Sequence, residues 1–91
     1  MLTLSQELTI VNKLGLHARA ATKLAQLCQS FTAQITLELE SKQADASSIM
    51  AILLLAGGHG KTVKVTAQGQ DAKKALAAIS QLISDKFDEE E

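Results

Sequence analysis

The spacing of apolar residues changes repeatedly along the chain, and this alternation limits the possible folds more than any other feature. In four segments apolar and polar residues alternate with a period of two, as in strands that have one solvent-facing side. Other segments show the three- and four-residue spacing of amphipathic helices, and one short segment is apolar throughout. The pattern predicts strands at 7–11, 35–39, 44–46 and 63–67, and helices at 18–31, 49–56 and 72–83, with Phe87 as a further core residue.

The resulting order, β-α-β-β-α-β-α, indicates an α+β fold. Strands that are apolar on one face suit an open antiparallel sheet covered on one side, because helices on both sides would require strands apolar on both faces. We therefore expect an open-faced two-layer β-sandwich, with a four-stranded antiparallel sheet and three helices on one side. Ser48 and Asp71 are the expected N-cap residues of the second and third helices, and Gly57-Gly58 is the expected end of the second.

The length and cysteine content exclude several classes of protein. A chain of 91 residues suits a single domain spanning 1–91. Its one cysteine can form neither an internal disulfide nor a cysteine-rich zinc site, which fits a reducing, cytoplasmic location. The longest apolar run, 49–56, is far shorter than the roughly 20 residues that cross a bilayer, so no membrane association is expected.

Charge is distributed unevenly along the chain. The total is −1, but four of the ten acidic residues form the tail 88–91, so the body carries +3. We expect this tail to be frayed and solvated. The charge of the body is too small for nucleic acid but favours an acidic protein surface as a partner. The two aromatic residues, Phe31 and Phe87, lie at the ends of helical patterns, so no base-stacking surface is expected either.

The segment from Gly15 to Ala21 places His17 and Arg19 at the start of the first helix. The first amides of a helix lack internal acceptors and the helix dipole is positive there, so an anion binds well at this position. Arg19 adds a planar cation that matches phosphate oxygens, and His17 adds a nucleophilic nitrogen. The residues alone leave two interpretations open, an anion site or a surface histidine beside an ordinary first-turn arginine.

Other candidate sites are weaker. Gly60-Lys61-Thr62 resembles the end of a nucleotide-binding P-loop, but Leu55 stands where that motif has glycine, and the segment lies between a helix and a strand. A helix end followed by a turn is therefore favoured, with His59 as a loop residue. Cys28 falls on the apolar stripe of the first helix and should be a buried, inert thiol. No residues show metal-ligand spacing, so we expect no metal or cofactor.

The apolar segment 49–56 raises the question of a docking surface, because a short helix can turn only part of its circumference toward a sheet. Its residues divide into a core-facing set, Ile52, Leu55 and Ala56, and a surface set, Ile49, Met50 and Leu53. A small exposed apolar patch that includes an adaptable methionine suits a protein partner. The alternative is that a neighbouring loop or helix covers it.

Two segments of the sequence resemble the signatures of HPr, the histidine phosphocarrier family of bacterial phosphotransferase systems. Gly15 to Ala21 resembles the active-site motif, and Ser47-Ser48-Ile49-Met50 resembles the second signature. The predicted order of elements matches over nearly the whole chain. Ile49-Met50 and Phe87 followed by acidic residues look closest to the nitrogen-related branch, often called NPr. The family often has proline where this chain has Ala20, in the first helical turn; alanine is also a good helix former, so the motif should remain intact.

The resemblance implies a role for each of these residues. His17 would accept a phosphoryl group from enzyme I, itself charged by phosphoenolpyruvate, and pass it to a histidine of an enzyme IIA protein. In the family the acceptor is Nδ1. Arg19 and the backbone amides of Ala18 and Arg19 would hold the phosphoryl group. Ser48 matches a serine that a kinase modifies in some members, although an N-cap role is the simpler interpretation.

The sequence therefore predicts a cytoplasmic, monomeric phosphoryl carrier that acts within a relay rather than as a stand-alone enzyme, and that serves regulation. Three alternatives remain. A carrier for carbohydrate uptake would use the same chemistry. A nucleotide-binding module would use Gly60-Lys61-Thr62, and a plain interaction domain would use the second helix without chemistry at His17.

Overall fold

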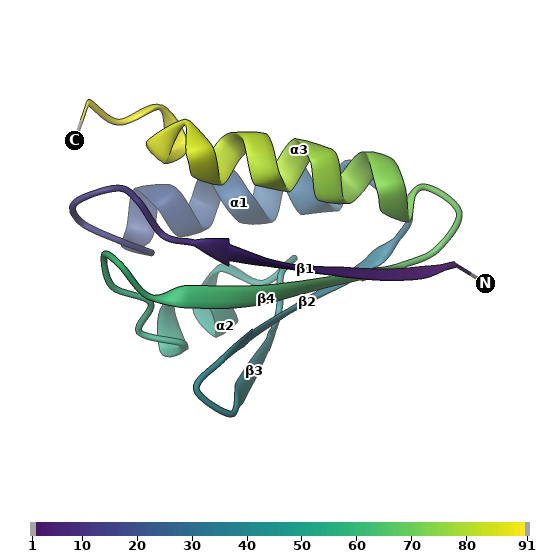
Figure 1. The fold of residues 1–91 in the computed structure, drawn as a ribbon, viewed down its shortest axis with the longest axis horizontal. Helices are drawn as coiled ribbons and strands as arrows, with labels where there is room; N and C mark the ends of the chain where they lie inside the picture. Colours follow the sequence, from purple (N-terminus) through teal and green to yellow (C-terminus); the bar gives the residue numbers. More distant parts are fainter. Residues whose placement is uncertain (1, 91) are drawn as a thin grey trace.

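A four-stranded antiparallel sheet forms one layer of the protein and three helices form the other, as the computed structural model shows for residues 2–90 (Figure 1). The order along the sheet is β1-β4-β2-β3. The predicted fold class and element order are confirmed. The elements are β1 (Thr3–Thr9), α1 (Ala18–Gln29), β2 (Gln34–Leu39), β3 (Lys42–Asp45), α2 (Ile49–Leu54), β4 (Thr62–Gln68), α3 (Ala72–Ser84) and the short helical turn η1 (Lys86–Asp88).

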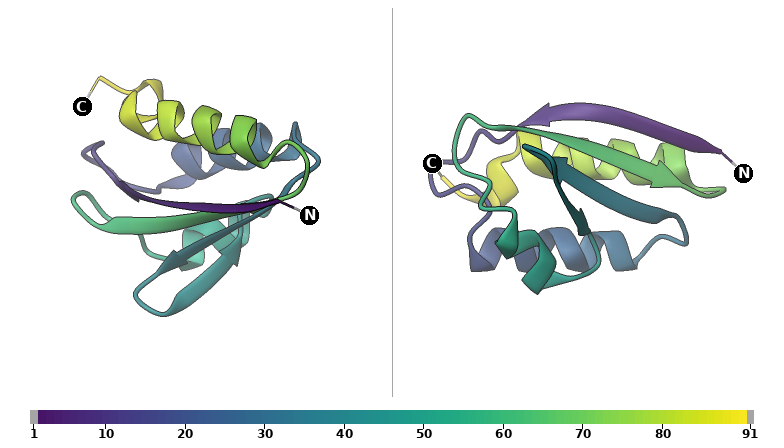
Figure 2. Two further views of the ribbon diagram at one scale, coloured as in Figure 1. Left: turned by 45° about the vertical axis from the view of Figure 1, so that its right-hand side comes forward. Right: turned by 90° about the horizontal axis from the view of Figure 1, so that it is seen from below.

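The core lies between the sheet and the helices because each strand presents apolar side chains on one face. In β2 and β4 alternate positions are buried, and Leu37 and Val65 face one another across the two central strands. Helices α1 and α3 lie side by side over this face (Figure 1 and Figure 2), while α2 packs against α1 and β3. The buried stripes of the two long helices are Ala20, Ala21, Leu24, Ala25 and Cys28 in α1, and Ala72, Ala75, Leu76, Ile79 and Ile83 in α3.

The element boundaries differ from the prediction where the apolar pattern runs past the regular structure. Strand β1 begins at Thr3 and ends before Ile10, which is fully buried but bonds outside the ladder, accepting from Gly60 N at 2.8 Å. Helix α1 ends at Gln29, and the C-cap residue Ser30 donates to Leu27 O through both its N–H, at 3.1 Å, and its hydroxyl, at 2.6 Å.

Two residues predicted at the ends of helices have other roles. Ala56, predicted in the core, is exposed and has φ of +55°, because the chain leaves α2 after Leu54 in a left-handed turn. Asp71 stands at the N-cap position of α3 but makes no side-chain cap hydrogen bond. Its two carboxylate oxygens instead accept from Thr32 N and Ala33 N, both at 2.8 Å, which ties α3 to the connection between α1 and β2. The hydrogen bond from Thr32 is the main reason that the pKa of Asp71 is below its usual range.

The acidic tail contradicts the prediction of a frayed end. Phe87 is fully buried, and the segment after α3 folds back to the end of the molecule where the loop after β1 lies (Figure 2). Lys23 Nζ donates to Phe87 O at 2.9 Å and pairs with Asp88 at 3.4 Å. The tail is ordered here because Phe87 contributes apolar burial that the charge pattern alone does not indicate. Of the predicted tail, Glu91 lies outside the described residues.

Candidate functional site at the start of helix α1

The loop before α1 is held against the segment that follows α2. Gly15 has φ of +67°, and a Cβ atom there would lie 2.4 Å from Gly57 O. Leu16 is buried and its N–H donates to that same carbonyl at 2.8 Å. Only glycine fits both this backbone angle and this close approach. The packing fixes the position of the next residue, His17.

His17 is the N-cap residue of α1, with extended backbone angles of −78° and 179°. Its carbonyl accepts from Ala21 N at 2.8 Å, but its side chain makes no cap hydrogen bond. The imidazole is therefore available for other contacts, and its side chain is 27% exposed. Ala18 and Arg19 follow as exposed first-turn residues, and the first turn holds no acidic residue that would compensate the helix dipole.

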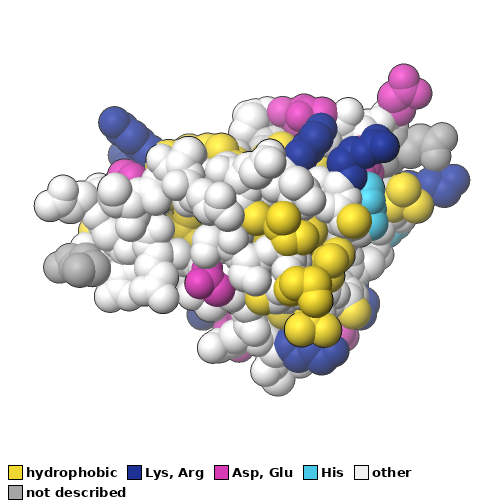
Figure 3. Space-filling model, turned by 180° about the vertical axis from the view of Figure 1, so that it is seen from behind, with side chains coloured by type: hydrophobic (Ala, Val, Ile, Leu, Met, Phe, Trp, Pro, Cys, Tyr) yellow, Lys and Arg dark blue, Asp and Glu magenta, His cyan; other side chains and the backbone are white. Residues whose placement is uncertain are grey.

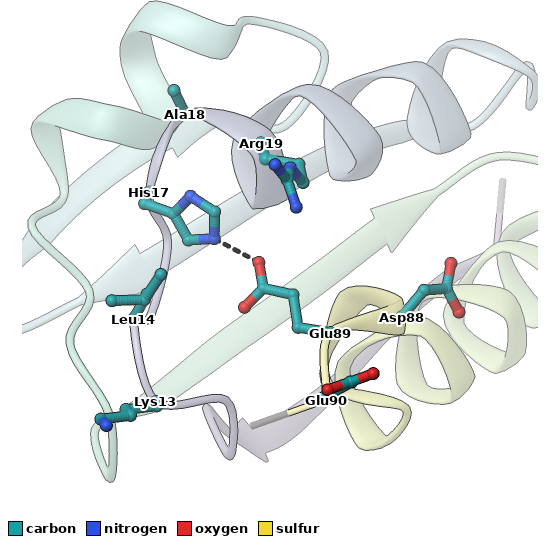
Figure 4. Close-up of a pocket in the computed structure, with 8 residues that line it drawn as sticks. All are labelled: Lys13, Leu14, His17, Ala18, Arg19, Asp88, Glu89 and Glu90. Carbon is teal, nitrogen blue, oxygen red and sulfur yellow. Dashed lines mark hydrogen bonds and ion pairs between the residues drawn. The ribbon is translucent and has the colours of Figure 1, made fainter.

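The side chain of Glu89 contacts His17 from the far end of the chain. His17 Nε2 forms a hydrogen bond with Glu89 Oε2 (Figure 4), and the Glu89 side chain is only 11% exposed. The second carboxylate oxygen, Oε1, accepts from Asn12 Nδ2 at 2.9 Å. Asn12 is fully buried and also donates to Gly15 O at 2.8 Å. One amide thus holds both the loop before His17 and the carboxylate that touches it.

The charge state of Glu89 follows from these contacts. Burial disfavours its ionised form, but the hydrogen bonds from Asn12 and His17, together with the charges of His17 and Arg19, outweigh that effect. The pKa of Glu89 is therefore lower than its ordinary value of 4.5. Glu89 is a carboxylate at neutral pH and acts as a hydrogen-bond acceptor toward His17.

These groups line an open depression of about 840 Å³, in which His17 and Arg19 lie across from Glu89 of the acidic tail (Figure 4). Its lining residues are Lys13, Leu14, His17, Ala18, Arg19, Asp88, Glu89 and Glu90. The structure thus brings together the predicted site residues His17, Ala18 and Arg19. Asn12 and Glu89, which are 77 positions apart, were not among the predicted site residues. The one signal for them was Phe87, whose burial anchors the residues that follow it.

Helix α2 presents its apolar residues as the helical geometry dictates. Ile52 is fully buried, and residues two positions away in either direction lie on the opposite side, because successive residues are 100° apart. Met50 and Leu54 are accordingly 69% and 74% exposed, and Ile49 is 37% exposed. Leu53 was predicted at the surface but is half-buried, since it lies only 100° from Ile52. We call Leu14, Ile49, Met50 and Leu54 the apolar patch; apolar side chains gather beside the histidine in Figure 3.

The remaining sequence candidates lie away from this depression. Ser48 is the N-cap of α2, and its hydroxyl accepts from Ala51 N at 3.2 Å, as predicted. Cys28 is buried, and burial followed by the nearby charge of Asp45 raises the pKa of its thiol to about 12, as expected for an inert residue. His59 lies in an exposed turn, and Lys61 pairs with Glu40 at 3.1 Å.

Two features are absent from the part of the chain that the structure describes. Between residues 2 and 90 there is no cluster of three or more potential metal ligands. In the same part of the chain no helix has the length and apolar character needed to cross a membrane.

The open-faced sandwich and the accessible histidine at a helix N-terminus, beside an arginine, fit the class of small phosphocarriers that the sequence resembles. Comparison with known proteins agrees with that class. Residues 4–85 match the family model described as the PTS HPr component phosphorylation site. This chain belongs to the HPr family, the phosphocarriers of the phosphotransferase system.

The similarity extends over nearly the full length of the relatives. The chain is 52% identical to phosphocarrier protein NPr of Shewanella violacea over 98% of each chain. It is 44% identical to phosphocarrier protein HPr of Cupriavidus necator, over 97% of this chain and 99% of that protein. The crystal structure of HPr from Thermoanaerobacter tengcongensis superposes with a TM-score of 0.93 at 40% identity, covering 97% of this chain and 99% of that one.

Proposed function

We propose that this protein accepts a phosphoryl group on His17 from enzyme I, charged by phosphoenolpyruvate, and passes it to a histidine of an enzyme IIA protein. The observation that carries this proposal is the position of His17, whose ring is partly exposed at the start of α1 and is not used as a helix cap. A nucleophilic ring nitrogen thereby lies beside the free amides of the first turn, which favour an anion.

The chemistry required of such a carrier is modest. Phosphoryl transfer depends mainly on positioning and on stabilising the charge of the moving group. In this protein the first-turn amides of Ala18 and Arg19, with the Arg19 guanidinium, would hold the phosphoryl oxygens. The depression around His17 is open, which suits handover between two proteins better than an enclosed pocket.

The apolar patch is the surface that we propose for docking of enzyme I and enzyme IIA. It adjoins the site because Leu14 lines the same depression as His17, and α2 packs against α1. The predicted preference for acidic partners needs one correction. Part of the acidic tail lines the depression, so the positive charges of Lys13 and Arg19 are not presented alone. The apolar contact is therefore the main contribution to docking that we expect.

The experiment that tests the function uses phosphoenolpyruvate with a radioactive phosphoryl group, enzyme I and the purified protein. We expect an acid-labile phosphate on the wild type and none on His17→Ala. His59→Ala is the matched control, since His59 lies in an exposed turn outside the site, and it should be labelled normally. Label that persists in His17→Ala, or that depends on His59, would contradict the proposal.

We further propose that the relay is a regulatory, nitrogen-related one in the cytoplasm and that the carrier acts as a monomer. The 52% identity to the Shewanella violacea NPr is the observation that supports the branch. The competing role is carbohydrate uptake. Transfer rates from nitrogen-type and sugar-type enzyme I, measured side by side, distinguish the two, and faster transfer from the sugar-type enzyme would contradict the nitrogen-related assignment.

A nucleotide-binding role is not supported by the geometry. A P-loop joins a strand to a following helix, whereas Gly60-Lys61-Thr62 here leads from α2 into β4.

A further inference from the structure

The C-terminal segment reaches the site through an unusual backbone. Lys86, Phe87 and Asp88 have φ of 58°, 54° and 63°, three successive residues in the left-handed region. This conformation is unfavourable for residues with a side chain, so it persists only where the surroundings fix it. Burial of Phe87 and the hydrogen bond from Lys23 to Phe87 O provide that fixation. The consequence is that the next residue, Glu89, points at His17.

Each oxygen of the Glu89 carboxylate has its own hydrogen-bond partner. Asn12 Nδ2 donates to Glu89 Oε1 and to Gly15 O, and both of these are acceptors, which fixes the orientation of the Asn12 amide. Glu89 Oε2 is left for His17 Nε2. An ionised carboxylate can only accept, so Nε2 must carry a proton. The other ring nitrogen, Nδ1, points away from Glu89 toward the start of α1 (Figure 4).

We propose that Glu89 is a positioning residue for phosphoryl transfer: anchored by Asn12, it holds His17 in the tautomer with the proton on Nε2, leaving the Nδ1 lone pair free beside the first turn of α1. This inference rests on the proposed function of His17 and adds a residue to it. In a neutral imidazole the partner of one nitrogen decides which nitrogen is protonated. Glu89 therefore selects the nucleophilic atom as well as the direction of the ring.

The transfer step balances with this arrangement. The Nδ1 lone pair forms the new bond to phosphorus, the bond between phosphorus and the donor atom breaks, and its electron pair returns to the donor. Nε2 keeps its proton throughout, so the ring gains positive charge as the bond forms. Glu89 faces that charge, as a carboxylate behind a catalytic histidine does in other enzymes. On the return step the ring becomes neutral again when the acceptor takes the phosphoryl group.

Glu89→Gln provides a sharp test because the hydrogen bonds would reverse their direction. Because Asn12 Nδ2 can only donate, it would hydrogen-bond to the side-chain carbonyl oxygen of the new glutamine. The glutamine NH₂ group would then face His17 and require Nε2 to accept, which moves the ring proton to Nδ1. Glu89→Ala imposes no tautomer and leaves Nε2 to water. Glutamine, the closer substitute in shape, should therefore impair transfer more than alanine does.

The experiment measures two quantities for wild type, Glu89→Gln and Glu89→Ala. The first is the tautomer of His17, from nitrogen-15 NMR of the unphosphorylated protein at mildly alkaline pH, where imidazoles are neutral. We expect protonated Nε2 in the wild type and protonated Nδ1 in Glu89→Gln. The second is the rate of phosphorylation by enzyme I. It should fall about 10–100-fold in Glu89→Gln, the range seen when an oriented histidine loses its carboxylate partner in metal sites, and less in Glu89→Ala.

Glu7→Gln is the matched control, because it makes the same substitution at an exposed glutamate of β1 that lies outside the depression around His17. It should retain the wild-type tautomer and rate. A Glu89→Gln variant that keeps protonated Nε2, or that is phosphorylated as fast as the wild type or faster, overturns the role of Glu89. His17→Ala is measured in the same assay. If the proposed function itself fails, His17→Ala is still labelled, so the two failures can be told apart.

Discussion

Asn12 and Glu89 are separated by 77 positions, yet the Asn12 side chain donates to the Glu89 carboxylate across 2.9 Å. The same amide holds Gly15 O at 2.8 Å, so one fully buried residue joins the loop before His17 to the C-terminal segment. Its own carbonyl oxygen finds no donor among residues 2–90. The two N–H groups of Asn12 are thus the part of the side chain that the structure uses.

Asn12→Asp should destabilise the protein more than Asn12→Ala. Alanine removes both hydrogen bonds, at a cost of about 1–3 kcal/mol. Aspartate adds a buried negative charge that faces two acceptors, Gly15 O and the Glu89 carboxylate. The free energy of unfolding from urea titrations measures the difference. An Asn12→Asp variant as stable as Asn12→Ala would show that the amide does not hold these two groups together.

The contribution of Glu89 to stability should depend on pH. Its pKa in the folded protein is lower than its ordinary value of 4.5. The unfolded chain therefore binds the proton more readily, and the stabilisation is full above pH 4.5 and lost as pH falls through the lower folded pKa. The measurement is the difference in free energy of unfolding between wild type and Glu89→Ala, followed downward from neutral pH.

That difference should shrink below about pH 4.5, the ordinary value for a glutamate carboxyl. Glu90→Ala serves as the comparison, since Glu90 is an exposed neighbour in the same tail. A Glu89 difference that grows on acidification would contradict the hydrogen-bonded carboxylate.

The parts of this structure that follow local rules were predictable, and the parts that depend on distant contacts were not. The strands, the helices and the Ser48 cap follow from periodicity and capping chemistry within a few residues. These features needed no knowledge of how the elements assemble. The outer position of Leu54, opposite Ile52 on α2, also follows from helix geometry, but the predicted surface set contained Leu53 instead.

Glu89 could not be assigned from sequence, because four consecutive acidic residues look like a solvated end. What orders this segment is a buried aromatic ring, a lysine from α1 and an asparagine from the loop after β1. Asp71 shows the same limit. It has the residue type and position of a helix cap, but its carboxylate lies closer in space to the amides of Thr32 and Ala33.

Met50→Glu should weaken transfer to and from both partners without unfolding the protein. Met50 is 69% exposed in the apolar patch, so a charge there disturbs an apolar interface but not the core. Phosphorylation rates at varied enzyme I and enzyme IIA concentrations should show weaker docking, with wild-type thermal stability. Leu2, an exposed apolar residue near the N-terminus and outside the apolar patch, provides the control variant Leu2→Glu. If both variants transfer the phosphoryl group at equal rates, the apolar patch is not part of the docking surface.

Ser48→Ala should lower stability by about 1 kcal/mol, because the Ala51 amide loses its cap. Ser48→Asp should retain stability, since aspartate also caps helices well, but it adds a negative charge next to the apolar patch. Thermal unfolding and partner-transfer rates measured on both variants separate the two effects. We expect Ser48→Asp to fold like the wild type and to dock more weakly; unchanged transfer would place Ser48 outside the interface and leave capping as its role.

Gly15→Ala should be strongly destabilising, whereas Gly58→Ala should be tolerated. At Gly15 a side chain would meet φ of +67° and a backbone oxygen, Gly57 O, at 2.4 Å. Neither can be relieved by a rotamer change, so the loss should be about 2 kcal/mol or more. At Gly58 a Cβ meets nothing within 4 Å. Because Gly15 leads directly into the His17 cap, its variant should also lose phosphorylation by enzyme I, while Gly58→Ala keeps it. Urea titrations and labelling assays check both outcomes, and a stable, fully labelled Gly15→Ala would show that the close packing of this loop on Gly57 does not position the histidine.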